Sequence, residues 1–271
     1  MKIFAILIAI NILFTITDFT ILIKETYAQS ADFKELRSDH FIISYHKDVD
    51  NAYVLQIKNI AEDFYRIITQ EFNLIRDALW LWENRAKIFI AKDKTSYAKE
   101  FQCTEWSAAC VNYKQKIIYT YPNQDNFKSI LAHELAHIIF HEYIVRGNSP
   151  LWLDEGIATY IENKYENGSY ERAIPFLKDK IRKSEYIKFS DLNTISYDDL
   201  RGSPSSEVSF FYLESFSIVN FMMKRYGKYN FSRFLTYFKS GDRIEAALLR
   251  AFYDAKNLGE VEKKWKTFYQ E

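Results

Sequence analysis

Residues 129–143 read SILAHELAHIIFHEY and hold three of the five histidines of the 271-residue chain. Within this stretch His133, Glu134 and His137 follow the pattern H-E-x-x-H. Four residues of an α-helix turn the chain by about 400°, so the two histidines project from nearly the same face, one turn apart. Two imidazoles in that arrangement suit a single Zn²⁺ ion. The segment therefore predicts a helix that carries a metal site.

Glu134 and the apolar flanks of the motif indicate what such a metal site does. Glu134 lies about 100° round the helix from His133, where its carboxylate can take a proton from water instead of binding the metal. We therefore predict Glu134 as a general base. A helix that is apolar almost all round is buried, and buried polar side chains need a partner, which a metal ion supplies. The apolar residues are Ile130, Leu131, Leu135, Ala136, Ile138 and Ile139.

A third protein ligand is expected from the stretch PLWLDEGIATYIE, residues 150–162. Hydrolytic zinc sites use three protein ligands and keep a fourth position open. Glu155 lies 18 positions after His137 (155 − 137 = 18) and is the candidate. Ser149 is expected to cap a second helix and Pro150 to open it, which places Glu155 in its early turns.

The neighbours of these candidates leave alternatives. Asp154 is the rival carboxylate beside Glu155. Gly156 and Ala158 are small, which permits a close approach of two helices. His141 continues the histidine spacing, but successive histidines rise about 6 Å along a straight helix, so three cannot converge on one ion. We expect an outer-shell or structural role for His141.

The motif H-E-x-x-H followed by W-L-x-E-G-x-A resembles the gluzincin branch of zinc metallopeptidases, particularly small bacterial peptidase MA-like domains. The resemblance implies one zinc ion per chain, held by His133, His137 and Glu155, with Glu134 as the catalytic acid and base. The metzincin pattern does not fit, because it requires a Gly three residues and a His six residues after the second His. This chain has Phe140 and Tyr143 there.

The resemblance also points to a later tyrosine that steadies the oxyanion during catalysis. Tyr212, in the stretch FFYLESFSIVNFMMKRYG, stands at the matching position. Its neighbours Phe210, Phe211, Leu213 and Phe216 are apolar, so a core tyrosine with a satisfied hydroxyl is an alternative reading.

These features predict a zinc metallopeptidase that hydrolyses peptide bonds of a peptide or protein substrate. Aminopeptidases hold the substrate amine with a Gly-x-Met-x-Asn-like segment, which is not visible in TEWSAACVNYKQK (residues 104–116), so endopeptidase action is favoured. In relatives of this type the segment over residues 104–121, which ends in a strand, lies beside the cleft, so the resemblance implies that an extended peptide adds there as a further strand. The alternative is a catalytically inactive zinc-binding or scaffold protein of the same fold. The presence of Glu134 argues against this alternative, because metal binding alone does not need that carboxylate.

The amino terminus predicts export. Residues 3–23 are largely apolar, follow Lys2 and precede small residues near Ala28, as in a secretory signal peptide over residues 1–28. An uncleaved membrane anchor is the alternative, but Asp18 within the apolar run argues for removal, since a mid-bilayer Asp costs about 2.5–3.5 kcal/mol. The remainder, residues 29–271, is expected to be one domain in the periplasm or outside the cell.

Cys103 and Cys110 are the only cysteines in the chain. In an oxidising compartment such a pair can close a small loop through a disulfide, and two buried thiols are the alternative. Two cysteines alone cannot make a structural zinc site.

Composition excludes several other functions. The chain has 36 basic and 36 acidic residues, so no net positive field is available to hold nucleic acid. It has seven glycines, all at or after Gly147, so neither a GxGxxG turn nor a Walker-type phosphate loop can be written.

The hydrophobic pattern predicts an α+β fold. Strands are expected at residues 41–46, 87–91 and 116–121, with a covering helix over residues 52–74. From residue 126 onward the pattern is helical, which predicts a small N-terminal mixed sheet followed by a mainly helical half that carries the H-E-x-x-H helix. Helices are expected to stop at Gly147, Gly168, Gly227, Gly241 and Gly259.

Overall fold

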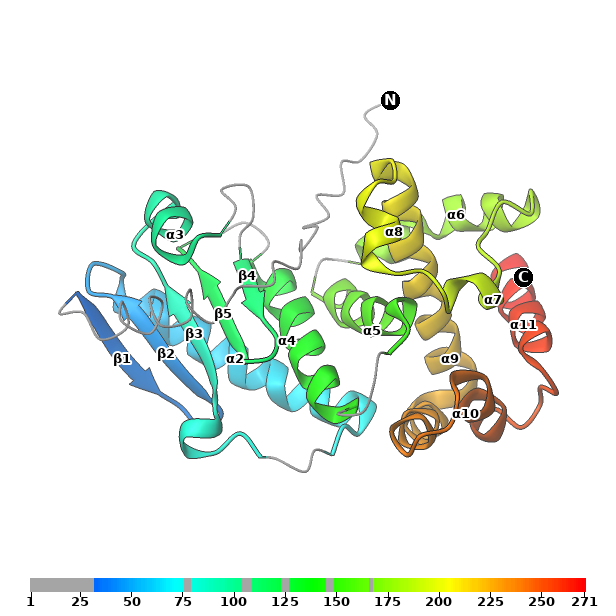
Figure 1. Cartoon of the computed structure of the whole chain (residues 1–271), viewed down its shortest axis with the longest axis horizontal. Helices are drawn as coiled ribbons and strands as arrows, with labels where there is room; N and C mark the ends of the chain where they lie inside the picture. Colours follow the sequence, from blue (N-terminus) through cyan, green and yellow to red (C-terminus); the bar gives the residue numbers. More distant parts are fainter. Residues whose placement is uncertain (1–31, 76–78, 104–108, 123–126, 145–148, 166–167) are drawn as a thin grey trace. The chain divides into compact units, whose positions relative to one another are not determined.

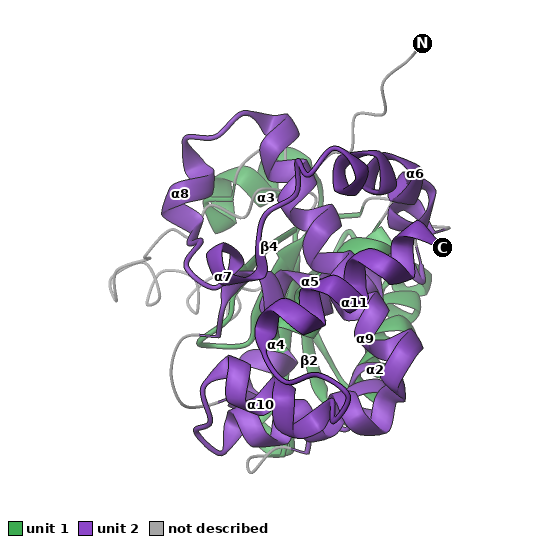
Figure 2. Ribbon diagram, turned by 90° about the vertical axis from the view of Figure 1, so that its right-hand side faces the viewer, with its two compact units in different colours: residues 1–67, 76–138 green, residues 68–75, 139–271 purple. Residues whose placement is uncertain are grey.

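The computed structural model describes residues 32–75, 79–103, 109–122, 127–144, 149–165 and 168–271. The predicted leader and Gly147 lie outside these residues. The chain divides into two compact units, coloured separately in Figure 2. Unit 1 comprises residues 1–67 and 76–138, and unit 2 comprises residues 68–75 and 139–271. Among the described residues, no helix is long and apolar enough to cross a membrane.

Unit 1 is built on a mixed sheet of five strands among its described residues, in the order β1-β2-β3-β5-β4 (Figure 1). The outer pairs β1–β2 and β4–β5 are antiparallel, whereas β2–β3 and β3–β5 are parallel. The predicted α+β order of a small mixed sheet followed by a mainly helical part is confirmed. The strands are β1 (Phe33–Arg37), β2 (Phe41–His46), β3 (Ala86–Ile90), β4 (Ala109–Asn112) and β5 (Ile117–Thr120).

Helices on the two faces of the sheet explain why its central strands are buried. The face that includes Phe41 of β2 meets α2, where Tyr65 stands edge-on to Phe41 at 6.4 Å between ring centroids. The opposite face includes Phe89 of β3, which packs on Phe101 of α3. The predicted strand over residues 41–46 is confirmed as β2, but its first four residues are all buried, whereas its alternating pattern is typical of a half-buried strand. The helices of this part are α2 (Asn51–Phe72), the short 3₁₀ helix η1 (Trp82–Asn84), α3 (Lys94–Phe101) and α4 (Phe127–Ile144).

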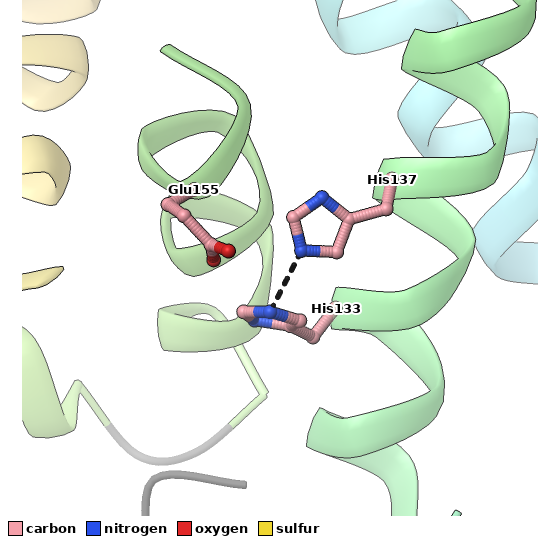
Figure 3. Close-up of side chains that lie close together, drawn as sticks. All are labelled: His133, His137 and Glu155. Carbon is pink, nitrogen blue, oxygen red and sulfur yellow. Dashed lines mark hydrogen bonds between the residues drawn. The ribbon is translucent and has the colours of Figure 1, made fainter. Parts of the chain in front are cut away.

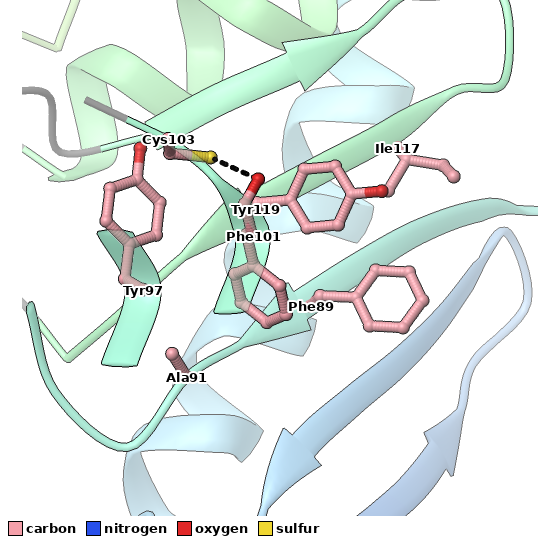
Figure 4. Packing of buried hydrophobic residues seen from close by; sticks show 7 residues of the cluster. All are labelled: Phe89, Ala91, Tyr97, Phe101, Cys103, Ile117 and Tyr119. Atoms are coloured by element: carbon pink, nitrogen blue, oxygen red, sulfur yellow. Dashed lines mark hydrogen bonds between the residues drawn. The ribbon is translucent and has the colours of Figure 1, made fainter. Parts of the chain in front are cut away.

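A disulfide between Cys103 and Cys110 joins the end of α3 to the edge strand β4, which confirms the predicted pairing. Cys103 belongs to an aromatic cluster on the α3 face of the sheet (Figure 4). A cross-link that closes a loop of this size stabilises the fold by about 2–3 kcal/mol in the chain-entropy account. The bond therefore holds β4 at the edge of the sheet. The cluster consists of Phe89, Ala91, Tyr97, Phe101, Cys103, Ile117 and Tyr119.

Unit 2 is helical, and its longest helix, α9, is its central element. α9 packs against α5, where a Cβ built at Gly156 would lie only 2.6 Å from the backbone oxygen of Ser215. On α11, Trp265 donates from its indole Nε1 to Ser217 of α9 at 3.0 Å. The helices are α5 (Leu151–Asn163), α6 (Ser169–Arg182), α7 (Phe189–Leu192), α8 (Tyr197–Arg201), α9 (Ser205–Lys239), α10 (Ile244–Ala251) and α11 (Leu258–Gln270).

The glycine positions match the predicted helix ends only in part. Gly168 stands between α5 and α6, and Gly241 follows the end of α9. Gly227 kinks α9 with a φ of 75°, a backbone conformation that favours glycine. Gly259 is the second residue of α11, so the prediction of a helix end there is wrong. The start of α5 also differs, because Pro150 itself is the N-cap residue and no side chain caps this helix.

Glu214 is a fully buried acidic residue of α9. Its two carboxylate oxygens accept the backbone N–H of Ile187, each at 3.1 Å, and so anchor the chain just before α7. Burial raises the pKa of Glu214 from 4.5 to about 8, helped by the nearby Glu262, while the Ile187 N–H acts in the opposite direction. The buried carboxyl is therefore protonated at neutral pH.

This raised pKa predicts a pH-dependent stability. A carboxyl whose pKa is higher in the folded state contributes stability that is fully present below its unfolded pKa and is lost as the pH rises through the folded pKa. We expect the free energy of unfolding to fall as the pH rises from about 5 to about 8, and Glu214→Gln to flatten that slope. Denaturant melts at several pH values measure it, with Glu207→Gln on the exposed surface of α9 as the control. An unchanged slope in Glu214→Gln would contradict the prediction.

Candidate metal centre

His133 and His137 lie one turn apart on α4, on the part of that helix that belongs to unit 1. The helix is apolar on most sides, and Leu131, Ala132 and Leu135 are fully buried. His137 is 2% exposed and His133 is half-buried. The imidazoles therefore stand on a helix that is otherwise in the core, where polar rings need a partner.

The two imidazoles face each other through one nitrogen each (Figure 3). The Nε2 atoms are 3.0 Å apart, with ring centroids at 4.7 Å and ring planes at 73°. Two nitrogen ligands of a tetrahedral zinc ion lie about 3.3 Å apart, given Zn–N bonds of about 2.0–2.1 Å. The pair is within a few tenths of an ångström of that spacing, so it fits a zinc ion. Figure 3 also draws Glu155, which belongs to unit 2.

Glu134, the predicted general base, directly follows His133 in the sequence. Its side chain is buried, with 2% of the residue exposed. Its Oε2 accepts a hydrogen bond from the hydroxyl of Tyr113 at 3.0 Å. The Tyr113 ring also stands edge-on to His137, with centroids at 5.5 Å. Tyr113 lies in the turn between β4 and β5, so the edge of the sheet supplies a donor to the base.

Glu155, the predicted third ligand, lies on α5 of unit 2 and is 2% exposed. Its Oε1 accepts a hydrogen bond from the hydroxyl of Tyr197 at 2.6 Å. Buried carboxylates require such partners, because an unpaired charge away from water is costly. The sequence pattern predicts a role for neither Tyr113 nor Tyr197, because each contacts its glutamate only in the folded structure.

Asp154 and His141 form a hydrogen bond within unit 2. The imidazole Nε2 donates to Oδ2 of Asp154 at 2.6 Å, and Asp154 is buried while His141 is exposed. Asp154, the rival of Glu155 as a ligand, thus has His141 as a partner. The pair lines a cavity of about 450 Å³, which is also lined by Tyr197.

Tyr212, the predicted oxyanion-stabilising residue, lies on α9 in unit 2 and is 6% exposed. Its ring stands edge-on to Phe211 with centroids at 5.9 Å. The oxyanion-stabilising role of Tyr212 stays a prediction.

A family model described as the Peptidase MA superfamily matches residues 89–271, which is more than half of the chain. The chain belongs to the Peptidase MA superfamily. The resemblance inferred from H-E-x-x-H and W-L-x-E-G-x-A is thereby confirmed. Membership of the Peptidase MA superfamily supports a function of the zinc-metallopeptidase type and implies a bound metal. The comparison with curated proteins finds no match.

The fold of this Peptidase MA member is similar to a solved structure of yeast LTA4 hydrolase in complex with bestatin. The two chains share 16% sequence identity, with a TM-score of 0.46. The similarity covers 88% of this chain but 38% of the yeast chain, so this chain spans well under half the length of that protein.

Proposed function

We propose that the protein is an exported zinc-dependent endopeptidase with one zinc ion per chain. The observation that carries the proposal is the pair of imidazoles on the core helix α4, whose nitrogens are 3.0 Å apart and match the spacing of zinc ligands. Family membership over residues 89–271 supports the same function.

In this proposal His133, His137 and Glu155 would hold the zinc ion, and three protein ligands are the number typical of hydrolytic zinc sites. Each ligand has a local environment suited to that task. The two imidazoles project from one face of α4, and the Glu155 carboxylate is buried and anchored by a tyrosine hydroxyl. Zinc bound there supplies a Lewis acid for the peptide carbonyl and makes water more acidic.

Glu134 moves the proton. Its carboxylate accepts a proton from the attacking water and returns it to the leaving amine of the cleaved peptide. The Tyr113 hydroxyl donates to Oε2 of Glu134, which restrains the carboxylate while further lone pairs remain for the proton. Tyr212 is the candidate for stabilising the negative oxygen that develops on the substrate carbonyl.

The edge strand β4 is the proposed docking position of the substrate backbone. Within the described sheet β4 pairs only with β5, so its other edge can accept an extended peptide as an additional strand. The turn after β4 carries Tyr113, which contacts Glu134, so a peptide on β4 would run toward the base. The middle of a chain can bind in this way, which supports endopeptidase action.

Two features support export. The leader predicted over residues 1–28 is of the secretory type. The disulfide between Cys103 and Cys110 is a bond that persists in oxidising compartments and is rare in the cytosol. We therefore place the mature protein in the periplasm or outside the cell.

Zinc stoichiometry tests the proposal most directly. Elemental analysis of the purified protein after incubation with zinc is expected to find about one zinc per chain, and clearly less in Glu155→Ala. Glu162→Ala is the control, because this glutamate lies on the same helix α5 and is outside both groups of described side chains that could hold a metal. A folded wild-type protein that takes up no zinc would overturn the proposal.

A further inference from the structure

Tyr197 contacts the carboxylate of Glu155 through its hydroxyl. Its hydroxyl donates to Oε1 at 2.6 Å, and the accepting side chain is 2% exposed. A hydrogen bond to an ionised group in such an environment is short and about twice as strong as one between neutral groups. The terminal torsion of a glutamate side chain is soft, so an anchor on one oxygen determines how the carboxylate faces its surroundings.

The local structure holds Tyr197 in place. Tyr197 is the first residue of α8, which begins with a capping box. The backbone N–H and hydroxyl of Ser196 both donate to Oδ2 of Asp199, at 2.8 and 2.6 Å. The capping box fixes the direction in which the chain enters α8, and with it the start of the Tyr197 side chain.

A second contact ties the same segment to α5. Trp152, three residues before Glu155, donates from its indole Nε1 to Oδ1 of Asn193 at 2.8 Å. The segment 193–197 is thus joined to α5 at Trp152 and at Glu155. Two attachment points on one helix leave little freedom to the Tyr197 hydroxyl, so the donor is placed before any ligand arrives.

We propose that Tyr197 is a positioning residue that orients the Glu155 carboxylate for metal binding. The inference rests on the proposed role of Glu155 as a zinc ligand. With Oε1 held by the phenol, the rotation of the carboxylate is restricted, and binding of the metal no longer has to order it. Hydrogen-bond partners of metal ligands commonly change metal affinity by 10- to 100-fold when they are removed.

Tyr197→Phe isolates this role because it removes only the hydroxyl. The ring is half-buried and lines the cavity of about 450 Å³, so phenylalanine can keep its packing. Tyr186→Phe is a matched control, since Tyr186 donates to Glu262 at 2.8 Å in the same unit but to no proposed ligand. Glu155→Gln reports whether the carboxylate binds zinc at all.

The experiment is a zinc competition titration of the full chain against a chromophoric chelator. We expect zinc affinity to fall by about 10- to 100-fold in Tyr197→Phe, to stay at the wild-type value in Tyr186→Phe, and to fall further in Glu155→Gln. We expect the zinc-free wild type and zinc-free Tyr197→Phe to have similar melting temperatures.

The outcomes separate this inference from the function it rests on. Unchanged affinity in Tyr197→Phe together with a large loss in Glu155→Gln overturns the positioning role and leaves the zinc site intact. Unchanged affinity in both variants overturns the ligand set as well. An equal loss in Tyr186→Phe overturns the specific role of Tyr197. If Tyr197→Phe does not fold, Ser196→Ala tests the positioning role instead. This variant removes a hydrogen bond of the exposed capping box and so loosens Tyr197. We expect it to weaken zinc binding, and an unchanged affinity would overturn the role.

Discussion

Glu134→Gln is expected to lower the rate of peptide hydrolysis by about 10²- to 10⁴-fold while the zinc content stays at the wild-type level. Glutamine keeps the size and one carbonyl oxygen of the side chain, so the Tyr113 hydroxyl can still donate to it. What glutamine loses is the ability to accept a proton from water and return it to the leaving amine. The measurement is the cleavage rate of a denatured protein substrate, with zinc determined on the same samples.

Glu142→Gln on the same helix is the matched control, because it removes one carboxylate from α4 outside the H-E-x-x-H motif. We expect it to retain wild-type activity. Equal and negligible activity of wild type and Glu134→Gln, with zinc present in both, would favour the alternative of an exported zinc-binding protein that hydrolyses nothing. A large loss in Glu142→Gln would show that the effect follows from charge on α4 and not from proton transfer.

The helix that carries the proposed metal ligands could be predicted because its signal is local. The four-residue spacing of His133 and His137 determines their common face before any tertiary structure is known. The helix over residues 52–74 was predicted equally well, since its apolar spacing persists for six turns, and the structure begins and ends it at Asn51 and Phe72. Periodic apolar patterns of this length are strong evidence for a helix.

Two strands were missed because they lack such a pattern. β1 has the sequence FKELR and lies at the sheet edge, with three of its five residues exposed. β4 has only four residues, ACVN. Both form because a neighbouring strand offers hydrogen-bond partners: β2 for β1 and β5 for β4. Edge strands of this kind depend on tertiary context more than on intrinsic preference.

The two tyrosines on the glutamates could not be predicted for a related reason. Tyr113 and Glu134 are 21 residues apart, and Tyr197 and Glu155 are 42 residues apart. The chain has 20 tyrosines, and none of these spacings follows a helical or strand period. Only the turn after β4 and the capping box of α8 bring the hydroxyls to their carboxylates.

Gly156→Ala is expected to destabilise unit 2, although alanine normally favours a helix. A Cβ at this position would lie 2.6 Å from the backbone oxygen of Ser215 and 2.8 Å from a methyl group of Val219. The side chain of Val219 can rotate, but the Ser215 carbonyl belongs to the backbone of α9 and cannot. Overpacking of a close helix pair costs about 1–3 kcal/mol. Replacing a glycine inside a helix by alanine normally stabilises the helix by about 0.5–1 kcal/mol, which is less than most of the expected overpacking cost.

Gly202→Ala provides the comparison for this prediction, because nothing lies within 4 Å of a Cβ built there. Its φ of −95° suits any residue, so the substitution is expected to leave stability unchanged or slightly raised. Thermal melts of both variants measure the difference, at about 2–4 °C per kcal/mol for a protein of this size. Equal melting temperatures for the two variants would contradict the prediction. Because Glu155 precedes Gly156 on α5, a helix displaced from α9 also carries the proposed ligand with it, so zinc affinity should fall in Gly156→Ala and not in Gly202→Ala.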